Sequence, residues 1–187
     1  NKVGGTSLGR PYASGGYRAA PDGRIVYTVA RPDRPADLAV IDRIGRTTQL
    51  TDLNSDVFAH KTMASVQEIT VQSSVDSRPI QAWVAKPADF DASKQYPLIL
   101  EIHGGPHAAY GPAFSAEIQL MAAKGYMVVW ANPRGSTSYG QDFANLIHHN
   151  YPSQDYDDLM DSVNAVVAQG NVDAEQLYVT GGSGGGV

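Results

Sequence analysis

The second half of the chain alternates between short apolar runs and amphipathic segments. The nearly continuous apolar runs at 97–102 and 126–131 predict strands that are buried on both faces, and residues 177–180 predict a short strand that runs into Gly181. Two other segments, 114–124 and 156–169, repeat apolar positions at helical spacing, and a glycine follows each of them. Because strands here alternate with helices, the pattern predicts an α/β fold with a parallel or mostly parallel sheet.

The first part of the chain shows a different pattern, with short β-rich runs between tight turns. Strands are expected at 25–30, 37–44 and 47–51, and the Pro21-Asp22-Gly23 sequence favours a turn before the first of them. The two prolines of 31–36 predict a loop. Together these runs predict a small antiparallel meander, which cannot bury a face by itself.

A predicted hairpin, made of strands at 66–72 and 79–86, connects the two patterns. We therefore draw a domain boundary near residue 60. Residues 1–60 are expected to be the end of an all-β domain, and residues 61–187 the N-terminal part of an α/β domain.

Composition and charge exclude several classes of function. The chain has 187 residues, a net charge of −5 and no basic stripe, which argues against a nucleic-acid partner. It has no cysteine, so disulfides, thiolate catalysis and Cys-ligated metals are excluded within it. No apolar run approaches the ~20 residues that span a bilayer, so no membrane partner is expected. No targeting segment is visible, and the compartment stays open between cytoplasm and periplasm.

The strongest chemical signal is the sequence GGSGGG directly after the last predicted strand. It contains the pattern G-x-S-x-G, formed by Gly181, Ser183 and Gly185. In this pattern the serine stands on a sharp strand-to-helix turn, so that its hydroxyl projects above the sheet as a nucleophile. The amide of Gly184 would then donate to the negative charge that develops on the substrate oxygen.

Two other interpretations of these glycines are a flexible linker and a phosphate-binding loop. A single G-x-S-x-G has many false positives. No lysine follows in the Walker pattern and the serine is central, so we rank the phosphate loop below the nucleophile turn.

The second signal is His103-Gly104-Gly105-Pro106, at the end of the predicted strand 97–102. Only glycine allows the backbone to come close to a substrate carbonyl, so we predict that the amide of Gly105 is the other oxyanion-hole donor. His103 is not expected to be the general base, because the triad order in α/β-hydrolases is serine, acid, histidine. An ordinary strand-ending turn is the competing interpretation.

The third signal is the sequence NPRGS at 132–136, after the predicted strand 126–131. Its arginine, Arg134, lies at the strand end where α/β sheets place ligands. We favour a structural ion pair that holds this loop, because a buried guanidinium forms bidentate bonds with a carboxylate.

Histidines and aspartates near the last predicted helix do not predict a metal site. The spacing of His148 and His149 relative to Asp155, Asp157 and Asp158 fits no metal-ligand pattern. The aspartates are expected to supply a helix cap and first-turn charge.

Taken in order, these motifs resemble the prolyl oligopeptidase family of serine peptidases, in particular its acylaminoacyl-peptidase and dipeptidyl-peptidase-like branch. The resemblance covers about residues 66–187 and four motifs: HGGP, NPRGS followed by Tyr139-Gly140, Tyr156-Asp157-Asp158, and GGSGGG. It implies an α/β-hydrolase domain preceded by a β-propeller, whose last blade the meander at 15–51 resembles. It also implies peptide substrates, an acyl-enzyme on Ser183, and no metal or cofactor.

Two features depart from the family pattern. The residue after the nucleophile is often tyrosine, and here it is Gly184. The family's acid and histidine lie beyond Val187, so we expect the chain to need the remainder of its hydrolase domain and to be inactive alone.

Other functions stay open at this point. A carboxylesterase or lipase-like hydrolase uses the same nucleophile turn, and an interaction protein can keep this fold without catalysis. The sequence does not choose between exopeptidase and endopeptidase, and it leaves the oligomeric state open, a homo-oligomer included.

Overall fold

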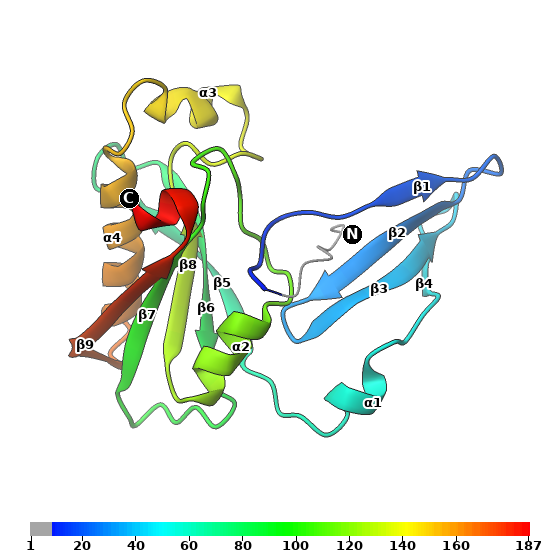
Figure 1. Ribbon diagram of the computed structural model, residues 1–187, viewed down its shortest axis with the longest axis horizontal. Coiled ribbons are helices and arrows are strands. Elements are labelled where there is room, and N and C mark those ends of the chain that lie inside the picture. The colour runs from blue at the N-terminus through cyan, green and yellow to red at the C-terminus, as the bar shows by residue number, and fades with distance from the viewer. Residues whose placement is uncertain (1–8) are drawn as a thin grey trace.

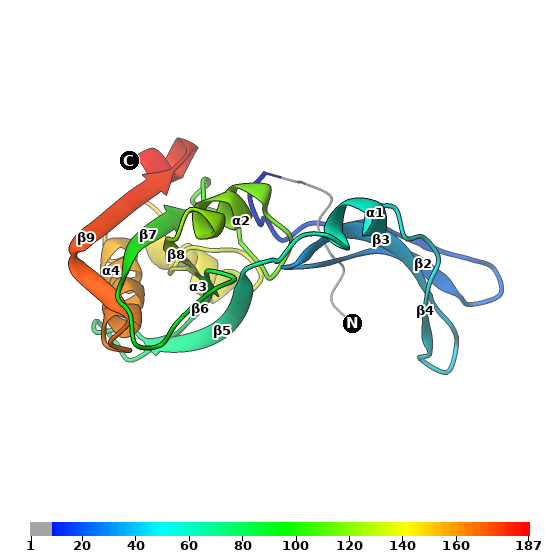
Figure 2. The same cartoon turned by 90° about the horizontal axis from the view of Figure 1, so that it is seen from below.

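The structure is a computed structural model that describes residues 9–187. Its strands form two separate sheets, one of four strands and one of five. Figure 1 shows them beside each other, joined by a segment that contains the short helix α1 (Ser55–Phe58). The view of Figure 2 shows that the molecule is elongated along the line between the two sheets.

The four-stranded sheet is an antiparallel meander in the order β1-β2-β3-β4. Its strands are β1 (Tyr17–Ala19), β2 (Ile25–Arg31), β3 (Arg34–Ile41) and β4 (Thr47–Gln49). The loop predicted at 31–36 is wrong in part, because β3 already begins at Arg34, which pairs with Arg31. The register shifts between Val29 and Arg31, and a proline such as Pro35 is tolerated beside an irregularity of this kind.

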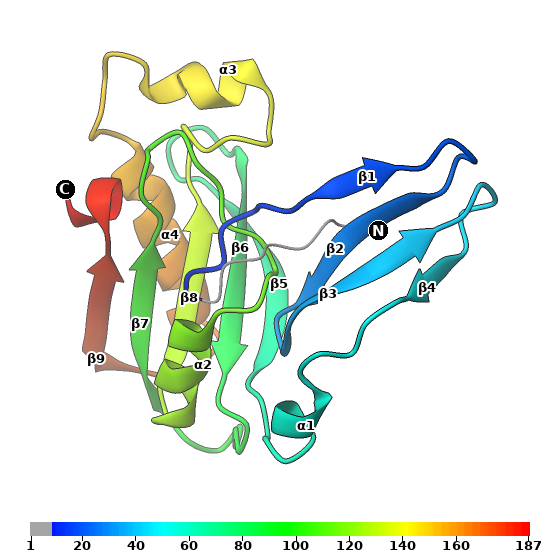
Figure 3. The ribbon, with the colours of Figure 1, turned by 45° about the vertical axis from the view of Figure 1, so that its right-hand side comes forward.

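The five-stranded sheet has the order β5-β6-β8-β7-β9 and mixed directions (Figure 3). Its strands are β5 (Ser65–Gln72), β6 (Pro79–Lys86), β7 (Tyr96–Ile102), β8 (Met127–Asn132) and β9 (Val172–Gly181). The hairpin β5–β6 and the pair β6–β8 are antiparallel, whereas β7 pairs in parallel with both β8 and β9. The prediction of parallel pairing therefore holds for the strands after residue 96.

Strand β9 starts earlier than the predicted strand 177–180. Tyr96 pairs with Val172, and the next pair joins Leu98 to Leu177. The irregular stretch between these pairs includes polar and exposed residues such as Glu175, so no apolar run marks it in the sequence. The bulge brings the end of β9 into register with the end of β7.

Two helices pack on opposite faces of the five-stranded sheet, α2 (Ala116–Ala123) and α4 (Asp155–Val167). The residues of β8 alternate between them. Trp130 belongs to the core under α2, together with Ile118, whereas Val129 belongs to the core under α4, together with Val163. Every residue of β8 is buried, which explains its continuous apolar run.

Shorter helical elements occupy the loops. They are α3 (Gln141–Ala144), η1 (Asn145–Ile147) and η2 (Ser183–Gly186). The predicted domain boundary near residue 60 falls between α1 and β5. Over residues 9–187, no helix has the length and apolar character needed to cross a membrane.

The buried face of α2 can be tested within one helix. Ile118 is 3% exposed and Leu120 is 68% exposed. In the full-length protein that contains this chain, we expect Ile118→Ala to lower the free energy of unfolding by about 2–4 kcal/mol, because it leaves a cavity beneath the helix. Urea denaturation measures the change. The matched control Leu120→Ala should have little effect, and equal losses from both would contradict the packing described.

Candidate active site

The two glycine-rich motifs lie side by side at one edge of the five-stranded sheet. Strands β7 and β9 are parallel neighbours, and their last pair joins Ile102 to Gly181. The loops that follow the two strands therefore leave the sheet at the same level. As a result, the structure brings the predicted site residues His103 to Pro106 next to the GGSGGG turn.

Ser183 is on a strained turn between β9 and η2. Its φ angle is 56°, in the left-handed region that a residue with a side chain seldom adopts. The residue is exposed, so its hydroxyl is accessible to a substrate. A strained, exposed serine at the end of a strand is the local geometry that a nucleophile turn requires.

The glycines on both sides of Ser183 are required by close backbone approaches. A Cβ atom on Gly181 would collide with the carbonyl of Gly185, and a Cβ atom on Gly185 would collide with the carbonyl of Ile102. The spacing G-x-S-x-G is thus a packing requirement of the turn, because the chain folds back on itself and against the end of β7.

Gly184 and Gly105 adjoin each other across the two loops. A Cβ atom on Gly184 would lie 3.1 Å from the Gly105 nitrogen, closer than a side chain normally packs. Glycine at 184 therefore permits this approach. The N–H of Gly105 donates a hydrogen bond to none of residues 9–187, and Gly105 is exposed. An unused donor thus stands beside the Ser183 turn.

His103 is buried behind the glycine loop. Its Nδ1 atom lies 2.8 Å from the Gly104 carbonyl oxygen and its Nε2 atom 2.9 Å from the Ser136 hydroxyl. Burial lowers the pKa of His103, which favours the neutral ring. Because a carbonyl only accepts, Nδ1 carries a proton and donates to Gly104, whereas Nε2 contacts the Ser136 hydroxyl, which itself donates to the Pro133 carbonyl at 2.7 Å. Both nitrogens are therefore occupied by partners other than Ser183.

The rest of the loop is supported by the segment after β8. The carbonyl of Pro106 accepts from the Ala108 N–H at 2.8 Å, and the Ala108 carbonyl accepts from the Thr137 N–H at 2.9 Å. The His107 ring lies 3.1 Å from the Gly135 carbonyl. The HGGP and NPRGS motifs, which are separate in sequence, thus form one packed unit.

Arg134 forms the buried ion pair that the sequence predicts for it. Its Nε and Nη2 atoms donate to the two oxygens of Asp158 at 2.9 and 3.0 Å, and the two residues are 3% and 0% exposed. The hydrogen bond with Asp158 raises the pKa of Arg134. Further acceptors are Gln154, Ser73 and Asp76.

Asp158 lies in the first turn of α4, as the sequence predicts, and it also faces the sheet as the partner of Arg134. Its position on the buried face of α4, one residue before Leu159, is the sequence signal that could have indicated this. Asp155, also expected as a cap, accepts from the Ser153 N–H at 2.6 Å just before the helix.

Three side chains at the site carry no sequence signal. The Tyr12 hydroxyl accepts from the Gly104 N–H at 2.8 Å. The Tyr151 hydroxyl donates to the Gly184 carbonyl at 2.7 Å. The guanidinium of Arg10 approaches Gly182, close enough that a Cβ atom there would collide with it. All three come from distant segments, so only the tertiary fold brings them to the glycine loops.

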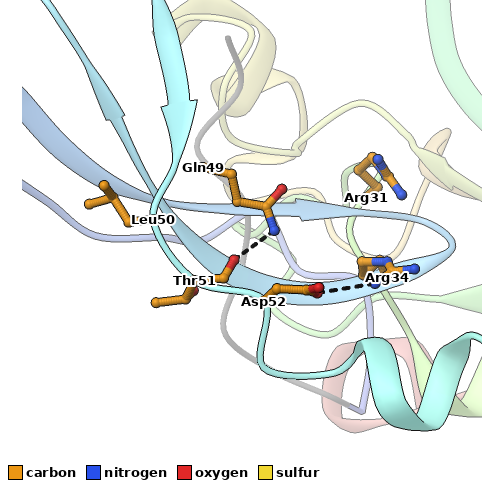
Figure 4. A pocket seen from close by; sticks show the side chains of 6 residues that line it. All are labelled: Arg31, Arg34, Gln49, Leu50, Thr51 and Asp52. Carbon is orange, nitrogen blue, oxygen red and sulfur yellow. Dashed lines mark hydrogen bonds and ion pairs between the residues drawn. The ribbon is translucent and has the colours of Figure 1, made fainter.

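One hollow adjoins the glycine turn, and another lies on the four-stranded sheet. A cavity of about 420 Å³ lies against Gly184 and Gly185 and is lined also by Tyr151 and Leu159. Figure 4 shows a polar hollow on the four-stranded sheet, where Arg34 pairs with Asp52 at 3.4 Å. Among the residues that the structure describes, no group of three or more His, Asp or Glu side chains is placed to hold a metal ion.

A sheet with helices on both faces, a serine on a strained turn after a strand, and a glycine loop after the neighbouring strand define an α/β-hydrolase. Comparison with known proteins gives the family. Residues 112–187 match the model described as "Prolyl oligopeptidase family". The chain is 41% identical over 172 residues to "Uncharacterized peptidase YuxL" of Bacillus subtilis. The aligned residues make up 91% of this chain and 26% of the relative.

Two further relatives agree with this family. The chain is 39% identical over 110 residues to "Probable dipeptidyl-peptidase 5" of Aspergillus terreus, 57% of this chain and 15% of the relative. The structure of the acylaminoacyl peptidase of Pyrococcus horikoshii is similar to this chain, with 32% sequence identity and a TM-score of 0.82. The match covers 94% of this chain and 28% of the peptidase chain.

The match to the prolyl oligopeptidase family thus covers residues 112–187, and the similarity to a named peptidase extends over 91% of the chain. The chain spans 26% of the length of YuxL and 28% of the Pyrococcus horikoshii chain. Its fold is the N-terminal part of an α/β-hydrolase domain, preceded by strands of a β-propeller.

The close approach of Gly185 to the Ile102 carbonyl predicts that adding one methyl group at position 185 strongly lowers catalytic activity. In the full-length protein, Gly185→Ala should push the Ser183 turn away from the end of β7 and lower kcat/KM for any substrate it hydrolyses by about 100-fold, as misplacement by about 1 Å does. The matched control is Gly186→Ala, because a Cβ atom there meets no atom within 4 Å. Equal activity of the two variants would contradict the geometry.

The buried ion pair predicts a loss of stability that exposed pairs do not share. Asp158→Asn removes the buried carboxylate of the pair and leaves Arg134 only the more exposed Asp76, so it should lower the free energy of unfolding by about 3–5 kcal/mol, measured by urea denaturation of the full-length protein. The control Asp22→Asn alters the exposed pair with Arg24 and should cause no measurable change. A loss from Asp158→Asn no larger than that of the control would contradict the structural role.

Proposed function

We propose that this protein is a serine peptidase that hydrolyses short peptides through an acyl-enzyme on Ser183. The observation that carries the proposal is the placement of a strained, exposed serine beside the Gly105 N–H, which donates to no residue in the described part of the chain. The family supports it, since the relatives matched over most of the chain are named as peptidases.

The proposed chemistry follows from these groups. The Ser183 oxygen attacks the peptide carbonyl carbon, and the carbonyl oxygen becomes negative in the tetrahedral intermediate. The N–H groups of Gly105 and Gly184 donate to that oxygen, which lowers the barrier because both are held in place before the reaction. The C–N bond then breaks, the amine leaves with a proton, and water later hydrolyses the ester.

The serine needs a base to accept its proton. His103 is unsuited, because Gly104 and Ser136 occupy its two ring nitrogens. In α/β-hydrolases the acid and the histidine follow the serine in sequence. We therefore propose that they come from a part of the hydrolase domain that this chain does not span, and that the 187-residue segment alone is inactive.

The type of peptidase is a choice between related activities. Relatives of this chain are named dipeptidyl-peptidase and acylaminoacyl peptidase, so removal of dipeptides and removal of acylated residues are both candidates. The carboxylesterase alternative uses the same turn and would show preference for esters over amides. The φ angle of 56° at Ser183, which a nucleophile turn requires, favours catalysis over the non-catalytic alternative.

The decisive experiment replaces the proposed nucleophile in the full-length protein that contains this chain. We expect Ser183→Ala to lower the hydrolysis of dipeptidyl and acetyl-aminoacyl p-nitroanilides by a factor of about 10³ or more. A fluorophosphonate should label the unmodified protein on Ser183, located by peptide mass spectrometry. Ser74→Ala, which removes an exposed hydroxyl elsewhere, is the matched control.

Three results would separate the alternatives. Turnover by Ser183→Ala equal to the control would reject Ser183 as nucleophile. Hydrolysis of p-nitrophenyl acetate without any cleavage of the anilides would favour the esterase. The absence of both labelling and turnover in the full-length protein would favour a non-catalytic role.

A further inference from the structure

A segment that precedes the four-stranded sheet, residues 9–13, lies against the loop after β7. In Figures 1 and 3 the chain before β1 runs from the four-stranded sheet across to the five-stranded sheet. The Ala13 N–H donates to the Ala109 carbonyl, and the Gly111 N–H donates to the Pro11 carbonyl, each at 2.8 Å. These bonds fix the segment beside the residues that follow the HGGP motif.

A buried polar cluster anchors the same segment. The Arg10 Nε atom lies 3.3 Å from Glu101, a residue of β7 that is 1% exposed, and 3.4 Å from Glu117 at the start of α2. The Tyr110 hydroxyl donates to Glu101 at 2.7 Å. Arg10 is therefore tied both to the strand that leads into the glycine loop and to the helix that follows it.

Tyr12 extends from this anchored segment to the site. Its ring packs edge-on against Tyr110 with centroids 4.8 Å apart. Its hydroxyl oxygen accepts from the buried Gly104 N–H, and a Cβ atom on Gly104 would lie 3.2 Å from both this oxygen and the Ser183 Cβ. Gly104 is thus enclosed between Tyr12 and the proposed nucleophile.

The two peptide groups that flank Gly104 are held from different directions. Tyr12 accepts from the N–H of the first peptide group. His103 Nδ1 donates to the carbonyl of the second, and that peptide group also contains the Gly105 N–H. A peptide group is planar, so the direction of its carbonyl sets the direction of its N–H.

Glycine is the residue with the widest choice of backbone dihedral angles. Without partners on both sides, Gly104 would let the Gly105 N–H swing away from the substrate oxygen. The two hydrogen bonds restrict both dihedral angles of Gly104, and the donor is oriented before the substrate arrives.

We propose that Tyr12 is a positioning residue for the oxyanion hole: with His103, it holds Gly104 so that the Gly105 N–H is aimed at the developing negative charge. The inference rests on the proposed function of Ser183. It assigns a role in catalysis to the segment that leads into the four-stranded sheet, outside the hydrolase sheet itself.

The test removes only the hydroxyl oxygen. In the full-length protein, Tyr12→Phe keeps the ring on Tyr110 and should lower kcat about ten-fold for the p-nitroanilide that the protein cleaves best, as loss of one oriented hydrogen bond does. KM should change less than about two-fold, because the interaction acts in the transition state. The matched control is Tyr17→Phe, since Tyr17 is 64% exposed on β1.

A second measurement separates positioning from folding. A peptide aldehyde forms a tetrahedral adduct with the serine, whereas the corresponding peptide alcohol does not. We expect Tyr12→Phe to reduce the ratio of aldehyde to alcohol affinity about ten-fold, in line with kcat. This ratio does not depend on the fraction of folded protein, so it remains informative even if the variant is less stable.

The outcomes distinguish this inference from the proposed function. If Ser183→Ala abolishes turnover but Tyr12→Phe matches Tyr17→Phe in kcat and in the affinity ratio, the positioning role is overturned and the nucleophile stands. If Ser183→Ala retains turnover, the proposed function fails first. A ten-fold loss in both kcat and the affinity ratio supports the inference.

Discussion

The candidate site depends on the parallel pairing of β7 with β9. This pairing places Ile102 opposite Gly181, so that the backbone turns after both strands meet at one level. The contact is tight: Gly185 packs on the Ile102 carbonyl, and Gly184 adjoins Gly105. The strained φ of Ser183 lies at this contact, beside the Gly105 N–H, which donates to none of residues 9–187. The two backbones approach here at distances that favour glycine.

Buried polar groups then hold the loops that surround this contact. Arg134 and Asp158 join the loop after β8 to helix α4 through two hydrogen bonds. His103 joins the glycine loop to Ser136, which belongs to the loop after β8. Loops that carry function need such support, because their backbones lack the regular hydrogen bonds of strands and helices. The result is a rigid edge in which three sequence motifs share one network.

The four-stranded sheet and the hydrolase sheet are connected by more than the covalent linker. The segment before β1 pairs with residues 109–111, and Arg10 and Tyr12 reach the end of β7 and the glycine loop. In this chain the segment that leads into the four-stranded sheet therefore shares direct contacts with the hydrolase sheet. This connection consists of specific hydrogen bonds and an ion pair.

The sequence by itself determined the local chemistry. The apolar runs marked β7 and β8, the helical spacing marked α2 and α4, and GGSGGG and HGGP identified the residues that the fold brings together. These features are readable because burial on both faces and tight turns each impose a residue type at a fixed spacing.

Tertiary structure decided the first half of β9, the start of β3 at Arg34, the partner of Arg134, and the approach of Tyr12 to Gly104. Such contacts join segments that lie far apart in sequence or depend on a bulge in the pairing. Nothing in the neighbouring residues encodes them, since the energy that selects them exists only once the sheet has formed.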